Sequence, residues 1–187
     1  ELCEKYRLPK LIFVTNMDDD HASFRELVLK LERRFGRSVA PFQLPIRENE
    51  KFVGYVNVVK MGGRRFTNLS DYEECEIPEY SKKNLGIARD ALLEAVAETS
   101  EEYMERYFSG EEFTLDEIQG ALREHVIDGS IVPVLMGSGI NCQGFKTLLQ
   151  VIDRYLPTPD KFECVGVDVS TGERFTAKYN DDVSLSA

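Results

Sequence analysis

Two short apolar segments, each followed by a loop and an amphipathic helix, constrain the fold of this chain more than any other feature. The first segment, residues 11–15, is a short apolar run that is followed by an acidic turn at residues 16–20. A strand of this length and composition is typical of one buried on both faces of a parallel sheet. A helix is predicted next, capped by Gly36, because apolar side chains recur at helical spacing; they are Phe24, Leu27, Val28, Leu31 and Phe35.

The second segment, residues 131–136, repeats this pattern near the other end of the chain. Pro133 counts against a regular strand there, because proline cannot donate a ladder hydrogen bond. A small-residue turn follows at residues 137–139, and then an amphipathic helix that Pro157 ends. Together the two units predict an α/β domain with parallel strands and flanking helices.

The block between the two units, residues 37–130, has a mixed pattern and is predicted to be an α+β subdomain inserted into the α/β domain. Residues 52–59 predict a strand. Gly62 and Gly63 predict a turn into a hairpin partner, and the polar residues 68–76 predict a loop.

Helices are expected in the second half of this block. A long helix is predicted after Pro78, with a break near Thr99 and Ser100. Thr114 and Glu117 fit a capping box, in which the hydroxyl and the carboxylate each bind a free backbone N–H group. The helix that this box opens is expected to end near residue 129.

Charge and composition narrow the possible partners. With 33 acidic and 23 basic residues, the net charge is −10, which argues against a nucleic-acid-binding face. Four scattered cysteines without metal-ligand spacing predict free thiols and a cytoplasmic protein. No run approaches the ~18 apolar residues of a membrane span, so no membrane contact is expected.

The two loops carry the candidate chemistry. Ligands of open α/β sheets bind beyond the carboxyl ends of the strands, where these loops are expected to lie. The Asp18 carboxylate could accept two parallel hydrogen bonds from the N1–H and N2–H groups of guanine, and backbone N–H groups of residues 137–139 could donate to its O6 atom. An acidic turn also serves as a helix N-cap or dipole partner, so the residues alone leave both interpretations open.

Several segments resemble translational GTPases of the elongation factor G type. Residues 11–18 resemble their strand and Asn-Lys-x-Asp guanine-specificity motif, and residues 137–139 resemble their Ser-Ala-x motif. The motifs follow the family's order over nearly the whole chain, which implies a partial P-loop-type GTPase domain. The segments similar to the family's G-prime insertion and to the exit from its nucleotide domain are residues 52–61, 94–107, 110–114 and 152–159.

The resemblance implies that the guanine base is bound by Thr15, Asn16, Asp18, Ser138 and Gly139. Thr15 stands where the family has Asn, and its hydroxyl can supply part of the same bonding. Asn16 stands where the family has Lys, so the apolar cover over the base is shorter. Gly139 replaces Ala, which is a mild change because the backbone N–H makes that contact.

A second register of the first motif remains possible. It places Asn16 at the first position and Asp19 at the last, but it puts Met17 where Lys belongs and lengthens the strand by one residue. The first register, which ends on Asp18, is therefore preferred.

The phosphate-binding parts of the family are not found in this sequence. It contains no G-x-x-x-x-G-K-[ST] loop, no magnesium ligand from the switch segments and no match to the family's catalytic His. No catalytic residue and no metal site are therefore predicted, and the fragment alone is expected to be inactive. The expected parts are a half GTPase domain, an insertion and a linker, at residues 1–36 with 131–160, 37–130 and 161–187 respectively.

The parent protein is expected to be a ribosome-associated GTPase that binds GTP and GDP and couples hydrolysis to translocation, with its Mg²⁺ ligands outside this chain. The resemblance implies that the insertion contacts the stalk protein of the large ribosomal subunit. Two alternatives stay open: a paralogue for ribosome recycling or protection, and a ribosome-binding module that has lost GTPase activity.

Overall fold

A computed structural model describes residues 2–6, 8–68, 71–158 and 164–177. The chain divides into two compact units, residues 1–156 and residues 157–187. Within the described ranges, no helix is long and apolar enough to cross a membrane.

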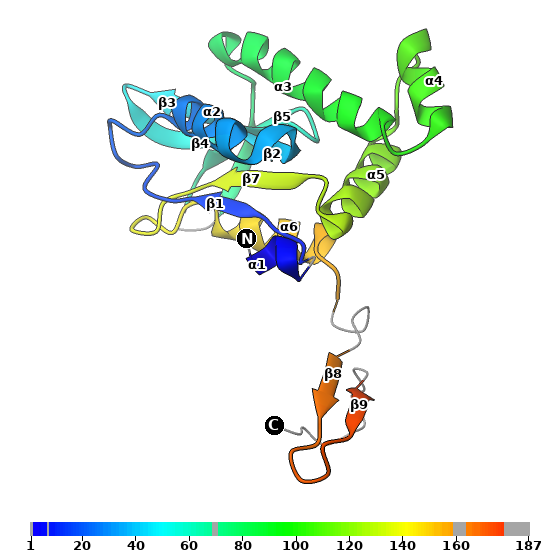
Figure 1. The fold of residues 1–187 in the computed structure, drawn as a ribbon. Helices are drawn as coiled ribbons and strands as arrows, with labels where there is room; N and C mark the ends of the chain where they lie inside the picture. Colours follow the sequence, from blue (N-terminus) through cyan, green and yellow to red (C-terminus); the bar gives the residue numbers. More distant parts are fainter. Residues whose placement is uncertain (1, 7, 69–70, 159–163, 178–187) are drawn as a thin grey trace. The chain divides into compact units, whose positions relative to one another are not determined.

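A three-stranded parallel sheet forms the centre of the first unit (Figure 1). Its order is β1 (Ile12–Val14), β7 (Val132–Met136) and β2 (Val39–Pro41). Helices α2 (Phe24–Phe35) and α6 (Phe145–Tyr155) cover opposite faces, since side chains of α2 pack with Val134 and Met136 while those of α6 pack with Leu135. The predicted α/β domain with a parallel sheet and flanking helices is confirmed.

The strand β2 corrects the predicted start of the middle block. The sequence pattern assigns residues 39–41 to the insertion, but they pair in parallel with β7, with Val39 opposite Val132. A short 3₁₀ helix, η1 (Gly36–Ser38), connects α2 to this strand. The parallel sheet therefore includes residues 39–41, which the sequence pattern assigned to the middle block.

The strand β7 forms in spite of Pro133 because of where that proline lies in the ladder. Peptide groups alternate sides along a strand, and the Gly137 N–H group donates to the Val14 oxygen of β1. The nitrogen of Pro133 therefore also faces the β1 side. Pairing with β1 begins only at Val134, opposite Ile12, so the missing donor interrupts no ladder bond.

Four antiparallel strands follow in the order β3 (Gln43–Glu48), β4 (Lys51–Asn57), β5 (Gly62–Phe66) and β6 (Tyr72–Cys75). The predicted strand at residues 52–59 is confirmed by β4. Gly62 and Gly63 lie in β5 rather than in the turn, and a Cβ atom on Gly63 would come within 2.6 Å of the Cys75 oxygen. Residues 68–76, predicted as a loop, contain the strand β6.

Three helices complete the segment between β2 and β7: α3 (Glu79–Ala97), α4 (Glu101–Ser109) and α5 (Leu115–Asp128). The predicted break is confirmed, because Ser100 caps α4 by accepting the Tyr103 N–H group. The predicted capping box is also confirmed, with Thr114 and Glu117 at the start of α5. We call residues 43–128 the β3–α5 segment.

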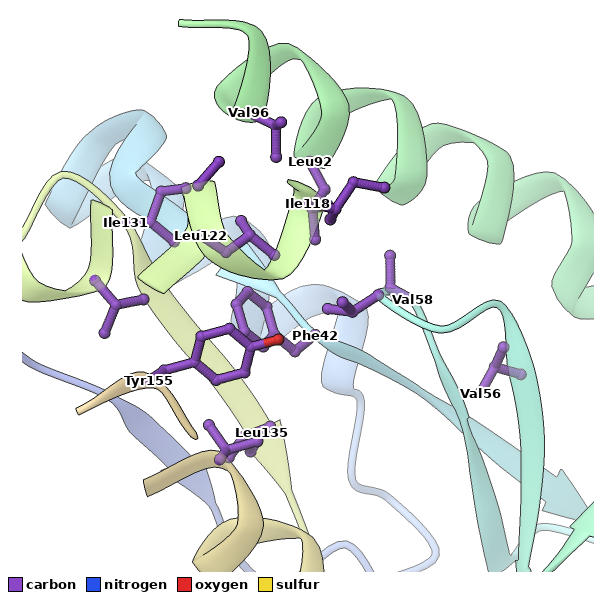
Figure 2. Close-up of a cluster of buried hydrophobic side chains, with 14 of the residues drawn as sticks. Phe42, Val56, Val58, Leu92, Val96, Ile118, Leu122, Ile131, Leu135 and Tyr155 are labelled. Carbon is purple, nitrogen blue, oxygen red and sulfur yellow. The ribbon is translucent and has the colours of Figure 1, made fainter. Parts of the chain in front are cut away.

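The β3–α5 segment shares a hydrophobic core with the parallel sheet (Figure 2). Phe42, at the entry to the segment, packs edge-to-face on Tyr155 of α6, with ring centroids 5.3 Å apart. Val58, Ile118 and Leu135 belong to the same buried cluster, and none of them is more than 1% exposed. Burial of this joint core stabilises both parts at once.

A short helix, α1 (Leu2–Lys5), precedes β1. The second unit contains an antiparallel hairpin, β8 (Cys164–Val167) and β9 (Arg174–Ala177), within the residues expected to be a linker. Its turn is fastened by the Asp168 carboxylate, which accepts the backbone N–H groups of Ser170 and Thr171. The last residues of the sequence lie outside the described ranges.

Candidate functional site

The two loops predicted to carry the chemistry lie side by side, because they leave adjacent parallel strands. The first loop, residues 15–23, follows β1, and the second loop, residues 137–144, follows β7. One backbone bond joins the second loop to the end of β1, and another joins the two loops. Gly137 N–H donates to the Val14 oxygen at 2.9 Å, and Met17 N–H donates to the Gly137 oxygen at 3.1 Å.

The first loop is anchored by Met17, which is 1% exposed and packs with Phe24 and Val28 of α2. Its neighbour Asn16 has a positive φ of 59°, in the left-handed region that Asn tolerates better than most residues. Thr15 and Asn16 are exposed at the loop surface. A buried Met next to exposed neighbours fixes the direction in which the loop turns.

The two acidic side chains that follow Met17 differ in their surroundings. Asp18 is partly buried, and its Oδ1 atom is buried without a hydrogen-bond partner in the described part of the chain. Asp19 is exposed, and its Oδ1 atom accepts the His21 N–H group at 2.8 Å. Asp18 therefore has an acceptor that no described residue bonds, whereas Asp19 closes a local turn.

The second loop is tightly built. Ser138 is fully buried and forms a two-bond bridge with Gln143, while its Oγ atom accepts the Asn141 N–H group at 3.2 Å. Gly137 must be a glycine, because a Cβ atom there would lie 2.2 Å from the Gln143 oxygen. Gly139 is exposed at the tip of the turn. Of the predicted residues, Ser138 is thus a structural centre and Gly139 a surface position.

Sequence reasoning missed Arg47 of β3, which clamps the first loop. Its Nη2 atom donates to the Met17 oxygen at 2.8 Å and to the Ala22 oxygen at 3.1 Å. Its backbone N–H and oxygen both bond the Tyr80 hydroxyl of α3, at 3.1 and 3.0 Å. A single arginine in a strand carries no sequence signal of this contact, since its acceptors are backbone atoms more than twenty residues away.

Gln43, also in β3, was missed for the same reason. Its Oε1 atom accepts the N–H group of Met136, the last residue of β7, at 2.8 Å. The second loop begins immediately after this bond. The β3–α5 segment therefore holds both loops, one through Arg47 and the other through Gln43.

A hollow of about 370 Å³ lies between the first loop and α2. Thr15, Asn16 and Asp19 line it, but Asp18 does not.

His21 lies in the first loop, and His125 is a partly buried residue of α5. His21 is exposed, and His125 on α5 lies 3.4 Å from the Asp128 carboxylate. Among the residues that the structure describes, no three His, Cys, Asp or Glu side chains are grouped so that they could hold a metal ion.

Comparison with known proteins identifies the family. The sequence profile of the elongation factor Tu GTP binding domain matches residues 1–158. A crystal structure of a protein from Thermus thermophilus is similar, with a TM-score of 0.77 and 29% sequence identity over 94% of this chain. The match covers 27% of that protein's chain, so the present chain spans about a quarter of its length.

The family implies a nucleotide domain that binds guanine nucleotide with Mg²⁺. A carboxylate oxygen that no described residue bonds, as at Asp18, is chemically suited to the N–H edge of guanine. With its parallel sheet, its paired loops and a match over residues 1–158, the chain belongs to the elongation factor Tu GTP-binding domain family of translational GTPases.

Proposed function

We propose that this chain is the guanine-reading part of an elongation factor G-like GTPase, carrying the β3–α5 segment as an inserted lobe. The proposal is supported by chain order: the lobe lies between the two loops, where the resemblance puts the G-prime insertion. The parent protein would couple GTP hydrolysis to ribosomal translocation in the cytoplasm. The match covers only 27% of the Thermus thermophilus protein, and the other domains of such a factor would lie outside this sequence.

Asp18 carries the proposal. Its buried and unpartnered Oδ1 atom supplies an acceptor for the N1–H and N2–H groups of guanine, and adenine has no such pair of donors. The partnered state of Asp19 supports the register that ends on Asp18.

Three neighbouring positions complete the half-site. Gly139 offers its backbone N–H group to the O6 atom of the base, on a turn that Ser138 holds rigid. Thr15 and Asn16 lie exposed beside Asp18 and cover the base and ribose in place of the family's Asn and Lys. Phosphate and Mg²⁺ contacts would come from parts of the parent protein other than this sequence, which contains no phosphate loop. The chain alone is therefore expected not to hydrolyse GTP.

The inserted lobe is proposed to dock on the stalk protein of the large ribosomal subunit. Helices α3 and α4 expose large apolar side chains, with Ile87 62% and Phe108 79% exposed. A mostly apolar groove of about 570 Å³ lies beside α3, lined by Ile87, Leu29 of α2 and Leu44 of β3. Exposed apolar surface of this kind is typical of a protein interface.

The test of base reading is Asp18→Asn in the intact parent protein, with GTP and xanthosine triphosphate affinities measured by titration. The amide cannot accept from the two guanine donors in the same way, so GTP affinity should fall roughly 100-fold and preference should move to the xanthine nucleotide. The matched control is Asp19→Asn, which keeps an oxygen acceptor for the His21 N–H group and should change GTP affinity less than about threefold.

If Asp19→Asn, rather than Asp18→Asn, changed the base preference, the second register would be correct. If the unmodified parent bound no guanine nucleotide, the base-reading proposal would be wrong and a ribosome-binding module without GTPase activity would replace it. Activity of the parent in ribosome release or protection assays without translocation would instead identify a recycling or protection paralogue.

A further inference from the structure

A cavity of about 190 Å³ lies where α6 meets the antiparallel sheet, away from the two loops. We call it the α6 cavity. Its charged lining consists of Lys60, Arg64 and Arg154 against one carboxylate, Asp153. Three cations around a small cavity are unexpected in a chain with a net charge of −10.

Arg64 is the most deeply buried of these cations, at 9% exposure. Its described contacts include no carboxylate: it donates to the Tyr55 hydroxyl at 3.1 Å and lies 4.3 Å from the ring centroid of Tyr72. By contrast, Arg106 in the same lobe forms ion pairs with two carboxylates, those of Glu111 and Glu117. A buried guanidinium without a counter-charge is costly, so the cavity favours an anion.

Arg64 is also held rigidly. The Tyr55 hydroxyl to which it donates is itself bonded to Thr147 of α6 at 2.5 Å. The Tyr72 ring beneath the guanidinium is held by a bond from its hydroxyl to Gln150, also of α6. Thr147, Gln150 and Tyr72 all line the cavity, so the same contacts that fix Arg64 shape its walls. A preorganised cation binds an anion with little loss of side-chain entropy.

Gln43 is a second lining residue with a polar group that lacks a hydrogen-bond partner. It lines the cavity, is 1% exposed, and its Nε2 atom is buried with no hydrogen-bond acceptor in the described ranges. The orientation of this amide is fixed, because Oε1 accepts the Met136 N–H group and a flipped amide would oppose two donors. The donor that remains unused is therefore a real N–H₂ group, for which an anion oxygen is a suitable acceptor.

We propose that the α6 cavity binds a small dianionic oxyanion, either inorganic phosphate or the terminal phosphate of a small phosphate monoester. Arg64 supplies the buried charge and its planar fork, and Gln43 supplies the unused amide donor. Lys60 and Arg154 add charge, and the cavity is also lined by Phe42, Leu135 and Tyr155, which belong to the buried cluster of Figure 2.

The overall negative charge of the chain does not prevent this binding. At physiological ionic strength, charges more than about 8 Å apart are largely screened. Asp153 is the only carboxylate among the described lining residues, and Glu74, opposite Arg64 in the β5–β6 ladder, forms no described ion pair with it. The local excess of positive charge also means that affinity falls as salt rises.

The test uses the intact protein saturated with a non-hydrolysable GTP analogue, so that all of the nucleotide's phosphate positions are filled. Phosphate and glycerol 3-phosphate are titrated by calorimetry, with sodium chloride at matched ionic strength as the reference. Both oxyanions should bind at one further site, whereas chloride should not. Tighter binding of glycerol 3-phosphate would identify a phosphorylated metabolite as the source, and equal or weaker binding would identify free phosphate.

Arg64→Gln should weaken this binding at least about tenfold, because it removes the charge but keeps hydrogen-bonding groups for Tyr55. Arg65→Gln is the matched control: it removes the same charge from the next residue, which is paired with Glu48 outside the cavity, and should change affinity less than about twofold. Lys60→Gln changes an exposed lining residue and should weaken binding about threefold without affecting folding.

The proposal is wrong if phosphate binds no better than chloride at the matched ionic strength. It is also wrong if Arg64→Gln binds phosphate as the unmodified protein does. Should Arg64→Gln fail to fold, Lys60→Gln decides, and unchanged affinity in that variant overturns the proposal.

Discussion

Replacing Arg47 by Met should loosen the first loop without unfolding the sheet. The methionine keeps the apolar stem but removes the bonds to the Met17 and Ala22 oxygens, at 2.8 and 3.1 Å. Hydrogen bonds from a charged donor contribute about 1.5–3 kcal/mol each, and partial exposure puts these two at the low end. Together they stabilise the closed loop by about 2–3 kcal/mol, which corresponds to roughly a 30- to 150-fold change in its opening equilibrium.

The assay for this change is hydrogen exchange of the intact protein, followed at the Met17 and Ala22 amides. Both amides are bonded in the closed loop, to the Gly137 and Asp19 oxygens respectively. In Arg47→Met, the exchange of both amides should therefore accelerate roughly 30- to 150-fold. Arg47→Lys should give an intermediate exchange rate, about tenfold faster than the unmodified protein, because the shorter lysine side chain cannot hold its ammonium within reach of both carbonyl oxygens.

Arg65→Met serves as the matched control, since this exposed arginine on β5 pairs with Glu48 and touches neither loop. Its effect at Met17 should be less than about threefold. Exchange at Met17 that stays within about threefold of the unmodified protein in Arg47→Met would refute the clamp. So would an equal acceleration in Arg65→Met, because a general loss of stability would then explain both.

Two further predictions concern the lobe. The pKa of Glu117 is lowered to about 2, first by its bond from Arg106 and then by those from Thr114. Because the folded pKa is depressed, the stability it contributes is present above the ordinary value near 4.5 and is lost as pH falls toward 2. Exchange protection at the start of α5 should fall over that range, and Glu117→Gln should show no such pH dependence. Ile87→Asp should weaken binding of the ribosomal stalk protein at least about tenfold in a pull-down titration, because it puts a charge into the proposed docking groove. Leu149→Asp, a matched change at a similarly exposed position on α6, should leave it unchanged, and equal losses in both would refute the docking surface.

The elements that could be predicted are those with a strong local pattern. β1 and β7 are covered on both faces and therefore read as apolar runs, and the Thr114–Glu117 box uses residues three apart. β2 has only three residues, and its partner strand lies more than ninety residues later, so no local pattern distinguishes it. β6 reads as a polar loop because two of its four residues are exposed glutamates, and it forms through pairing with β5.

Some features of the candidate site could likewise be predicted from the sequence, and others could not. The adjacency of the first and second loops follows from parallel strand order, and Asp18 stands out as an acidic residue at a strand end. The contacts of Arg47 and Gln43 could not be predicted, because each joins a strand of the lobe to backbone atoms distant in sequence. A strand position predicts which face a side chain occupies, not which distant carbonyl or N–H group it will meet.

The bonds from Gln43 and Arg47 have a consequence for any shortened form of this domain. Deleting residues 43–128 and rejoining the chain would leave the Met136 N–H group and the Met17 oxygen without their side-chain partners. It would also strip the packing from Leu135 and Tyr155, which are now buried against the lobe. A relative without the lobe must therefore carry substitutions at these same places in the sheet, which makes them the first positions to compare between long and short forms.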